Sequence, residues 1–405
     1  MLGRSALFSV AIWIAFVGVL RIAVVPPESC GSPNRDAIAG AAVAAEGWLQ
    51  RNQGLDGRYV YIYDHDTDTI SSEYNEVRHA GVTMALYQAA GRFQDADALG
   101  AGDDGLAWMN ENLIRQDGWA ALAPGGGRAK LGASALMLVA VAERRLATAD
   151  PQHDELMREL GRFIVALQRG DDGFYVAWLP AERAPQLEGT SRFFPGEAFW
   201  ALALLHEAFP GEGWDGPARL AADFLTTRRD EVEDVSFPPL ADQWTAYGLA
   251  EMVEWGLDDH HVAYARRLAE RFGFLIRMEA QRQGSALGTL LRGGEIRAAA
   301  TGTWVEGMAA LWRLASVDER LADLRPEIKE RLACAGGILA EQQVSGEESA
   351  NYAEPGLVDG AWFIGGETRM DDQQHAFSGL LYTVDALDDR IQREPDAPMT
   401  TDASP

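Results

Sequence analysis

The segment from Tyr74 to His79 gathers four residue types that can act together on a sugar carboxylate. Abstracting the proton beside a carboxylate requires a cation or amide to neutralise that carboxylate, and a Tyr or His to move the proton. Arg78 can hold a carboxylate through two parallel hydrogen bonds, with Asn75 beside it. The positive charge of Arg78 is also expected to lower the pKa of a neighbouring tyrosine. We therefore predict that Tyr74 or His79 transfers the proton while Arg78 and Asn75 hold the substrate.

Carboxylates offer a second chemistry, glycoside hydrolysis, which needs two acids flanking the scissile bond. Acidic residues recur in apolar surroundings near the starts of several helix-sized segments: Glu197, Asp242, Glu306, Glu367, Asp371 and Asp372. Acids at helix N-termini are also explained by capping alone. The pattern is thus compatible with hydrolysis without being specific for it. The candidate catalytic acids are Glu197, Asp242, Glu306 and Asp372.

Aromatic residues stand next to some of these acids, as Trp244 follows Asp242 and Trp304 precedes Glu306. An apolar ring face beside hydrogen-bonding groups suits a sugar. Tyrosines alternate with Val and Ile over residues 59–63, so we expect them on one face of a strand, with Thr69 starting a second strand. The predicted substrate-binding residues are Tyr59, Tyr61, Tyr63, Asn75, Trp119, Trp244, Trp304, Glu367, Arg369 and His375. Trp178, Trp200 and Trp362 are further stacking candidates.

Two kinds of helical segment alternate along the chain with a period of roughly fifty to sixty residues, which is typical of stacked helical hairpins. One kind is rich in Ala, Leu and Trp and is expected to be buried all round: His79–Leu86, Gly132–Ala142, Gly196–Glu207, Gln243–Trp255, Val305–Ala315 and Gln373–Ala386. The other kind is amphipathic and needs only one apolar stripe: Ala41–Asn52, Gly105–Ile114, Glu155–Leu167, Pro217–Thr226, Val262–Arg277 and Pro326–Glu341. We predict an all-α fold, an (α/α)6 toroid of two concentric helix layers with a small β-hairpin near the N-terminus.

Gly-rich turns with the pattern Gln, then Asp-Gly, then an aromatic residue separate the early segments, at residues 53–57, 116–119 and 168–174. This pattern resembles the repeat punctuation of α/α toroids among terpene cyclases, prenyltransferases and carbohydrate-active enzymes. The segment from Tyr74 to His79 resembles the C-terminal catalytic domain of D-glucuronyl C5-epimerases, and more loosely α/α-toroid alginate and heparin lyases. The resemblance implies roles at the substrate for Tyr74, Asn75, Arg78 and His79. The acidic character of this chain departs from those families.

Charge and cysteine content limit the partners and cofactors. The chain of 405 residues carries a formal net charge of −26, which disfavours nucleic acid as a partner. Cys30 and Cys334 match no metal or redox spacing, and Cys334 is interpreted as a buried small apolar residue. The run Asp64-x-Asp66-x-Asp68 lacks the Gly and Glu of a calcium-binding loop. We therefore expect no metal and no cofactor.

An apolar stretch from Ala6 to Val25, interrupted by Arg21, predicts a secretory signal or membrane anchor. No small-residue cleavage site follows it. The expected location is the cell membrane, as a single-pass protein with its body outside the cytoplasm, or secretion. The predicted divisions are a signal or anchor at 1–25, a linker at 26–36, the toroid at 37–390 and a disordered tail at 391–405.

The favoured interpretation is an enzyme acting on a carbohydrate, by epimerisation or elimination at a uronate. Hydrolysis with paired carboxylates is the alternative. A terpene-cyclase-like toroid and a non-catalytic glycan-binding scaffold are further alternatives. The motif around Asp371 and Asp372 lacks the first Asp of a cyclase cluster, and the acids and Tyr/His groups argue against a scaffold.

Overall fold

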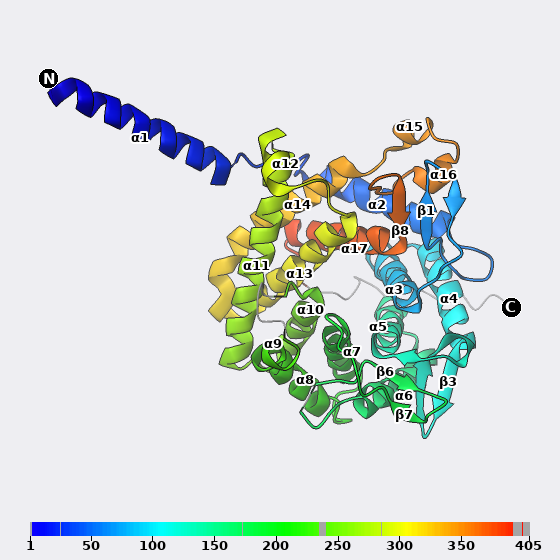
Figure 1. The fold of residues 1–405 in the computed structure, drawn as a ribbon. Helices are drawn as coiled ribbons and strands as arrows, with labels where there is room; N and C mark the ends of the chain where they lie inside the picture. The colour runs from blue at the N-terminus through cyan, green and yellow to red at the C-terminus, as the bar shows by residue number, and fades with distance from the viewer. Residues whose placement is uncertain are drawn as a thin grey trace.

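The computed structural model describes residues 2–24, 26–171, 173–234, 240–284, 286–391 and 399. Across these residues, two concentric layers of six helices each form a closed ring (Figure 1). The outer helices are α2 (Arg35–Arg51), α4 (Ala96–Glu111), α6 (Asp154–Ala166), α8 (Asp215–Thr227), α11 (Asp259–Gln283) and α14 (Arg325–Gln342). The inner helices are α3 (Glu76–Phe93), α5 (Leu131–Thr148), α7 (Phe194–Ala208), α10 (Gln243–Met252), α13 (Ala298–Val317) and α17 (Met370–Leu387). The predicted toroid is confirmed.

Burial differs between the layers as the two sequence patterns predict. Every residue from His79 to Ala90 on inner helix α3 is buried. Outer helix α6 buries only a stripe that includes Leu156, Leu160 and Phe163. The ring closes where α17 packs against α3 and where α14 packs against α2. A helix that is apolar all round needs neighbours on every side, and the outer layer provides them.

Three glutamines that follow outer helices each donate a hydrogen bond to a backbone carbonyl of a neighbouring outer helix. Gln53 Nε2 donates to Ala101 O on α4 at 2.8 Å. Gln168 Nε2 donates to Pro217 O on α8 at 3.1 Å. Gln343 Nε2 donates to Ala41 O on α2 at 2.9 Å, across the point where the ring closes. The recurring Gln is therefore explained by contacts between hairpins.

Long connections run from each outer helix to the next inner helix and carry three small antiparallel sheets. The first has the order β2 (Thr69–Ile70), β1 (Ile62–Asp64), β8 (Glu367–Arg369). The others pair β3 (Leu113–Gln116) with β4 (Trp119–Leu122), and β5 (Ala129–Lys130) with β6 (Ala177–Leu179) and β7 (Ala184–Pro185). The β1–β2 hairpin agrees with the sequence, whereas its pairing with β8 joins segments too far apart to predict.

Short helices complete the connections. They are α9 (Arg229–Val232), α12 (Ala286–Arg292), α15 (Gly346–Ser349) and α16 (Pro355–Val358), with 3-10 turns at η1 (Pro124–Gly126), η2 (Pro151–His153), η3 (Val253–Trp255) and η4 (Glu319–Leu324). Helix α13 begins at Ala298, earlier than the predicted Val305, because three alanines with high helix propensity open it. Glu306 consequently lies inside α13 instead of at its first turn.

The N-terminal helix α1 (Leu2–Val24) projects away from the ring (Figure 1). Large apolar side chains along it are exposed, among them Leu7, Trp13 and Phe16. Among the described residues, none of the helices combines the length and apolar character needed to cross a bilayer. Most of the predicted disordered tail, residues 391–405, lies outside the described residues; Met399 N–H donates to Ala147 O at 2.8 Å.

The two cysteines form a disulfide bond, so the prediction that Cys334 is simply a small apolar residue was wrong. Cys30 and Cys334 are 304 residues apart in sequence, and their Cα atoms are 4.5 Å apart. The bond attaches the segment before α2 to α14, next to the point of ring closure. Sequence spacing gave no signal for it, since only the closed ring brings the two residues together.

Candidate active site

A buried carboxylate–imidazole pair joins the last two inner helices. Glu306 Oε2 on α13 lies 2.7 Å from His375 Nδ1 on α17, and Gln374 Nε2 donates to Glu306 Oε1 at 3.2 Å. Burial alone would lower the pKa of His375, but the charge and hydrogen bond of Glu306 outweigh it, so this pKa is raised. The carboxylate of Glu306 keeps the proton of the neutral imidazole on Nδ1. No described residue forms a hydrogen bond with Nε2 of His375. His375 Nε2 is therefore the atom that can exchange a proton with a substrate.

Two glycines allow α13 and α17 to approach closely enough for this pair. A Cβ on Gly302 would lie 2.4 Å from the backbone carbon of His375. A Cβ on Gly379 would lie 3.1 Å from the Cβ of Val305 and 3.2 Å from the carbonyl oxygen of Gly302. Only glycine leaves room for the contact at Gly302 without moving backbone. The small residues in these helices thus position the acid and the base.

Arg78 lies in the same cluster and holds two partners. Its Nη1 donates to the hydroxyl of Tyr61 at 2.7 Å, and its Nη2 lies 2.9 Å from Oδ2 of Asp371. Asp371 lies one helical turn before His375 on α17, so Arg78, through its contact with Asp371, is held near His375. Arg78 keeps 27% of its side chain exposed, which leaves it accessible. The structure thus brings together the predicted residues Arg78, Tyr61, Glu306 and His375.

Aromatic side chains form one side of this cluster. The ring of Trp244 is 5.8 Å from that of His375 and 5.6 Å, stacked, from that of Trp200. Trp200 also stacks on Tyr247 at 4.4 Å. Trp244 is 3% exposed, so it mainly positions His375. Trp304 on α13 is partly exposed, in contrast to the buried Trp119 and Trp362.

His79 and Tyr74 contact each other between α3 and α4, and the ring of Tyr74 is 6.1 Å from that of Tyr61; their role in proton transfer stays a prediction. His79 is fully buried, with Nδ1 2.6 Å from the hydroxyl of Tyr74 and Nε2 2.9 Å from Gly105 O. Burial lowers the pKa of His79 to about 4. Burial raises the pKa of Tyr74, opposite to the predicted direction, although Arg58 acts to lower it. Both nitrogens of His79 are occupied, so it supports the fold.

Three other predicted binding residues also have structural roles. Asn75 caps α3, and its Oδ1 accepts from the backbone N–H of Val77 and Arg78. The hydroxyl of Tyr59 lies 3.0 Å from Thr83 Oγ1, and the hydroxyl of Tyr63 donates to Asp68 at 3.1 Å. Tyr63 belongs to a small core separate from that of Tyr59 and Tyr61. Tyr59, Tyr61 and Tyr63 are all buried and alternate with the partly buried Val60 and Ile62, as the period of two predicts, but of the three only Tyr61 reaches Arg78.

Glu197 and Asp242 are neighbours at the starts of α7 and α10. Asp242 is fully buried, caps α10, and forms an ion pair with the buried guanidinium of Arg229. Glu197 is buried, and its Oε2 has no hydrogen-bond partner among the described residues. Burial, together with the charge of Asp242, raises the pKa of Glu197 to about 8. Asp242 therefore has a structural role, whereas Glu197 is a protonated acid at neutral pH.

Asp372 joins the starts of α13 and α17. Arg297 Nη1 contacts Asp372 Oδ2 at 2.8 Å, and the backbone N–H of Ala299 donates to Oδ1 at 3.1 Å. Arg297 also pairs with Glu367 at 2.5 Å, and Glu367 pairs with Arg369 at 2.9 Å. Asp372 is buried, and both of its oxygens accept hydrogen bonds from Arg297 and from backbone N–H groups, which gives it a structural role at the starts of the two helices. This network fixes the position of β8 beside the cluster.

The remaining aromatic candidates pack within the protein. Trp119 contacts Phe163 and Trp178, with ring centroids 5.1 and 5.5 Å apart. Trp362 Nε1 donates to Leu339 O at 2.8 Å. Neither Arg229 nor Arg297 was predicted, because both lie in connections outside any periodic segment. Arg297 directly precedes α13, whereas Arg229 follows Arg228 and has no sequence signal that separates it from a surface residue.

No protein-family model matches the chain, and no curated protein sequence matches it. Solved structures do share its fold. Cellobiose 2-epimerase from Spirochaeta thermophila is 14% identical, with a TM-score of 0.61 over 87% of this chain and 97% of that one. A D-mannose isomerase is 11% identical, with a TM-score of 0.59 over 87% and 97% of the two chains. An unsaturated glucuronyl hydrolase specific for heparin is 10% identical, with a TM-score of 0.59 over 89% and 100%. These similarities establish the toroid fold.

Proposed function

We propose that the chain is a carbohydrate-active enzyme that transfers a proton at a sugar carbon beside a carbonyl or carboxylate group. The supporting observation is the buried Glu306–His375 pair, adjacent to Arg78 and Asp371. The fold neighbours include a sugar epimerase, a sugar isomerase and a hydrolase of unsaturated glucuronyl groups, all named for carbohydrate substrates. Epimerisation or isomerisation of a sugar beside a carbonyl group can proceed by such a proton transfer.

In this mechanism His375 acts as the general base. Its Nε2 accepts the proton from the sugar carbon, and the imidazolium that forms is stabilised by Glu306 at Nδ1. Negative charge develops on the neighbouring carbonyl or carboxylate oxygen. The side chain of Arg78 is 27% exposed, and it can stabilise that oxygen by exchanging its contact with Asp371 for one with the substrate. Returning the proton to the other face, or to the neighbouring carbon, completes epimerisation or isomerisation.

The uronate C5-epimerase or lyase favoured by the sequence is one form of this proposal, in which Arg78 holds the sugar carboxylate. A neutral sugar fits the local charges better. Arg78 is paired with Asp371, Arg297 with Glu367 and Asp372, and Lys130 with Glu76 at 2.9 Å. Arg78, Arg297 and Lys130 thus each already have an acidic partner, so these three cations add no excess positive charge for an anionic substrate.

Hydrolysis is the second candidate, because Glu197 has the protonation state of a general acid. Its pKa of about 8 keeps it protonated at neutral pH, and an inverting or retaining glycosidase needs one such acid. The matching carboxylate would be Asp371, whose Oδ2 pairs with Arg78 but whose Oδ1 has no hydrogen-bond partner among the described residues, whereas both oxygens of Asp372 are occupied. Terpene-cyclase chemistry is less compatible with this site, because Asp372 accepts from Arg297 and backbone N–H groups and offers no proton.

Incubating the full chain with neutral and uronate glycans in heavy water distinguishes these reactions. Deuterium at C2 or C5 of the recovered sugar supports proton transfer, with C5 labelling indicating a uronate substrate. An unsaturated product indicates a lyase, and new reducing ends without deuterium contradict the proposal in favour of hydrolysis. His375→Asn should abolish deuterium incorporation. His153→Asn, at a histidine between α5 and α6, serves as the control.

We further propose that the ring lies outside the cytoplasm, anchored through α1 or secreted. The Cys30–Cys334 disulfide supports this location, because such bonds persist in oxidising compartments. The exposed apolar side chains of α1 fit a segment that is recognised for export. Labelling surface proteins of intact cells with an impermeant amine reagent, with and without deletion of residues 2–24, tests the proposal. Labelling only after cell lysis would contradict it.

A further inference from the structure

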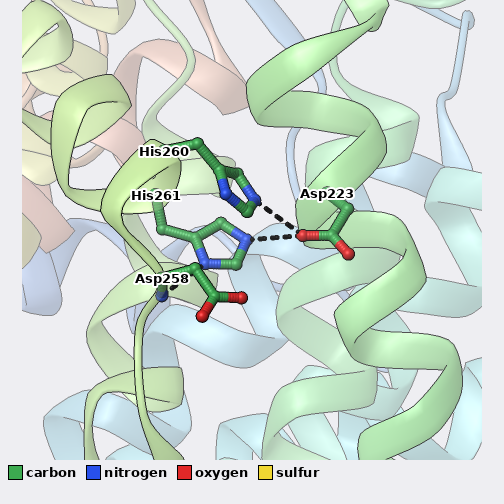
Figure 2. Close-up of side chains that lie close together, drawn as sticks. All are labelled: Asp223, Asp258, His260 and His261. Carbon is green, nitrogen blue, oxygen red and sulfur yellow. Dashed lines mark hydrogen bonds and ion pairs between the residues drawn. The ribbon is translucent and has the colours of Figure 1, made fainter.

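Four metal-ligand side chains converge in the outer layer, on helices that do not carry the Glu306–His375 pair. Figure 2 shows Asp223 on α8 facing His260, His261 and Asp258 at the start of α11. One ligand atom from each residue lies within 4.8 Å of those from the other three. No ligand set was expected here, because the sequence places Asp223 far from the other three. Adjacent outer helices bring them together.

One oxygen of Asp223 organises the cluster. Asp223 Oδ1 is 2.7 Å from His260 Nε2 and 3.0 Å from His261 Nε2. Zn²⁺ binds imidazole nitrogen and carboxylate oxygen at about 2.0–2.2 Å, which places neighbouring ligands of a tetrahedral site about 3.3 Å apart. The contact between Asp223 and His260 needs to open by about 0.6 Å to admit such an ion. The Asp223 side chain is 50% exposed, so it has room to rotate.

His261 is held differently from His260. The backbone N–H of Asp258 donates to His261 Nδ1 at 3.1 Å, so the neutral ring carries its proton on Nε2. This Nε2 is buried and lies 3.0 Å from Asp223 Oδ1, so one carboxylate oxygen is shared by the two imidazoles. If Asp223 binds a cation, His261 Nε2–H needs another acceptor, because a buried donor left without one is costly. A water molecule bound to a cation in the cluster would accept this hydrogen bond.

We propose that Asp223, Asp258 and His260 bind a divalent transition-metal cation, with Zn²⁺ the best match, and that His261 donates to a metal-bound water. Imidazole with carboxylates selects Zn²⁺ and similar ions over Ca²⁺, which takes oxygen ligands. Two carboxylates neutralise the ion, and the net charge of −26 attracts cations to the surface. His260 is 38% exposed, so the ion can enter from solvent. The cation then links the fourth and fifth outer helices.

The test is a titration of the full chain, stripped with a chelator, with Co²⁺ as a visible-absorbing substitute for Zn²⁺. We expect one equivalent to bind with visible absorption bands, and Zn²⁺ to displace it. Asp223→Asn and His260→Ala should each weaken binding by about 10-fold or more. Asp259→Asn is the matched control, because Asp259 starts the same helix but is fully exposed and outside the cluster. This control should bind as the unchanged chain does.

Thermal unfolding provides a second measurement that does not depend on activity. Zn²⁺ should raise the Tm of the unchanged chain and of Asp259→Asn, but not that of Asp223→Asn. Circular dichroism of the metal-free variants should match that of the unchanged chain, which separates loss of binding from loss of folding. Non-saturating Co²⁺ binding, or equal affinity in Asp223→Asn and the unchanged chain, would overturn the proposal.

Discussion

Glu306 and His375 form their 2.7 Å contact between inner helices α13 and α17, which approach closely at Gly302. The contact determines how the imidazole titrates. Because the carboxylate raises the pKa of His375, the ring stays protonated to higher pH than a free histidine. A base must be neutral to accept a proton, so the rate of the proposed reaction should rise with pH through this pKa.

Glu306→Gln should show how much Glu306 contributes to the pKa of His375 and how much to the rate of the proposed reaction. Replacing the carboxylate removes the main influence that raises the pKa of His375, so the acidic limb of the kcat/KM profile should move to lower pH. The rate at the optimum should fall about 100-fold or more, because the imidazolium loses its counter-charge. The measurement is kcat/KM between pH 5 and 9. Glu111→Gln, at an exposed end of α4, is the control; an unshifted limb in Glu306→Gln would contradict the assigned pair.

Arg78→Ala should abolish turnover and leave the far-ultraviolet circular dichroism unchanged. Arg78 stands at the start of α3 with 27% of its side chain exposed, so its loss should not unfold the ring. Removing a donor that stabilises developing negative charge typically costs about 10²–10³-fold in kcat. Arg92→Ala provides a comparison, because Arg92 lies at the other end of α3 and pairs with Asp385. Full activity of Arg78→Ala would remove Arg78 from the mechanism.

Helical periodicity sufficed to predict the toroid. Inner helices are buried on all sides and outer helices on one stripe, and these two kinds of burial leave different residue patterns. Periodicity identified both layers and the β1–β2 hairpin. It did not predict the start of α13, since the alanines from Ala298 have high helix propensity but no period. It also did not predict β8 or the Cys30–Cys334 bond, which depend on ring closure.

The site was predicted only in part, for a geometric reason. Arg78 and His79 are adjacent in sequence, but successive residues on a helix point about 100° apart. Arg78 therefore reaches Asp371, whereas His79 is buried against Gly105. His375 was expected to bind substrate and Glu306 to act as an acid. Their pairing depends on the register of α13 against α17, and the register of two helices cannot be predicted from a single sequence.

Glu197 should make the protein less stable as pH rises from about 5 to 8. Its pKa is about 8 when folded and near 4.5 when unfolded, so the unfolded chain releases its proton first and gains stability from that release. Over the full window the effect is roughly 3–5 kcal/mol. Glu197→Gln should remove this contribution, so its stability relative to the unchanged chain should increase with pH. Urea unfolding at pH 5 and pH 8 measures the difference, and a constant difference would contradict the burial of an uncharged acid.

Arg229→Met should destabilise the fold strongly, because the carboxylate of Asp242 would remain buried without its counter-charge. Breaking such a pair from one side costs about 3–5 kcal/mol. Arg183→Met is the control: Arg183 is 68% exposed and lies 3.8 Å from Asp117, so its removal should change stability by less than about 1 kcal/mol. Adding Asp242→Asn to Arg229→Met should recover part of the loss. Urea midpoints that do not differ between the two single variants would rule out a structural role for the pair.

Replacing both cysteines should lower the free energy of unfolding, because the unfolded chain gains conformational freedom without the bond. The Cys30–Cys334 bond closes a loop spanning 304 residues, and removing such a bond typically costs about 2–5 kcal/mol. The double variant Cys30→Ser/Cys334→Ser should therefore unfold at lower urea than the unchanged chain. A reductant should lower the midpoint of the unchanged chain to that of the double variant, and should not affect the variant itself. Equal midpoints with and without reductant in the unchanged chain would show that the bond does not form in solution. The support that it gives to an extracytoplasmic location would then be lost as well.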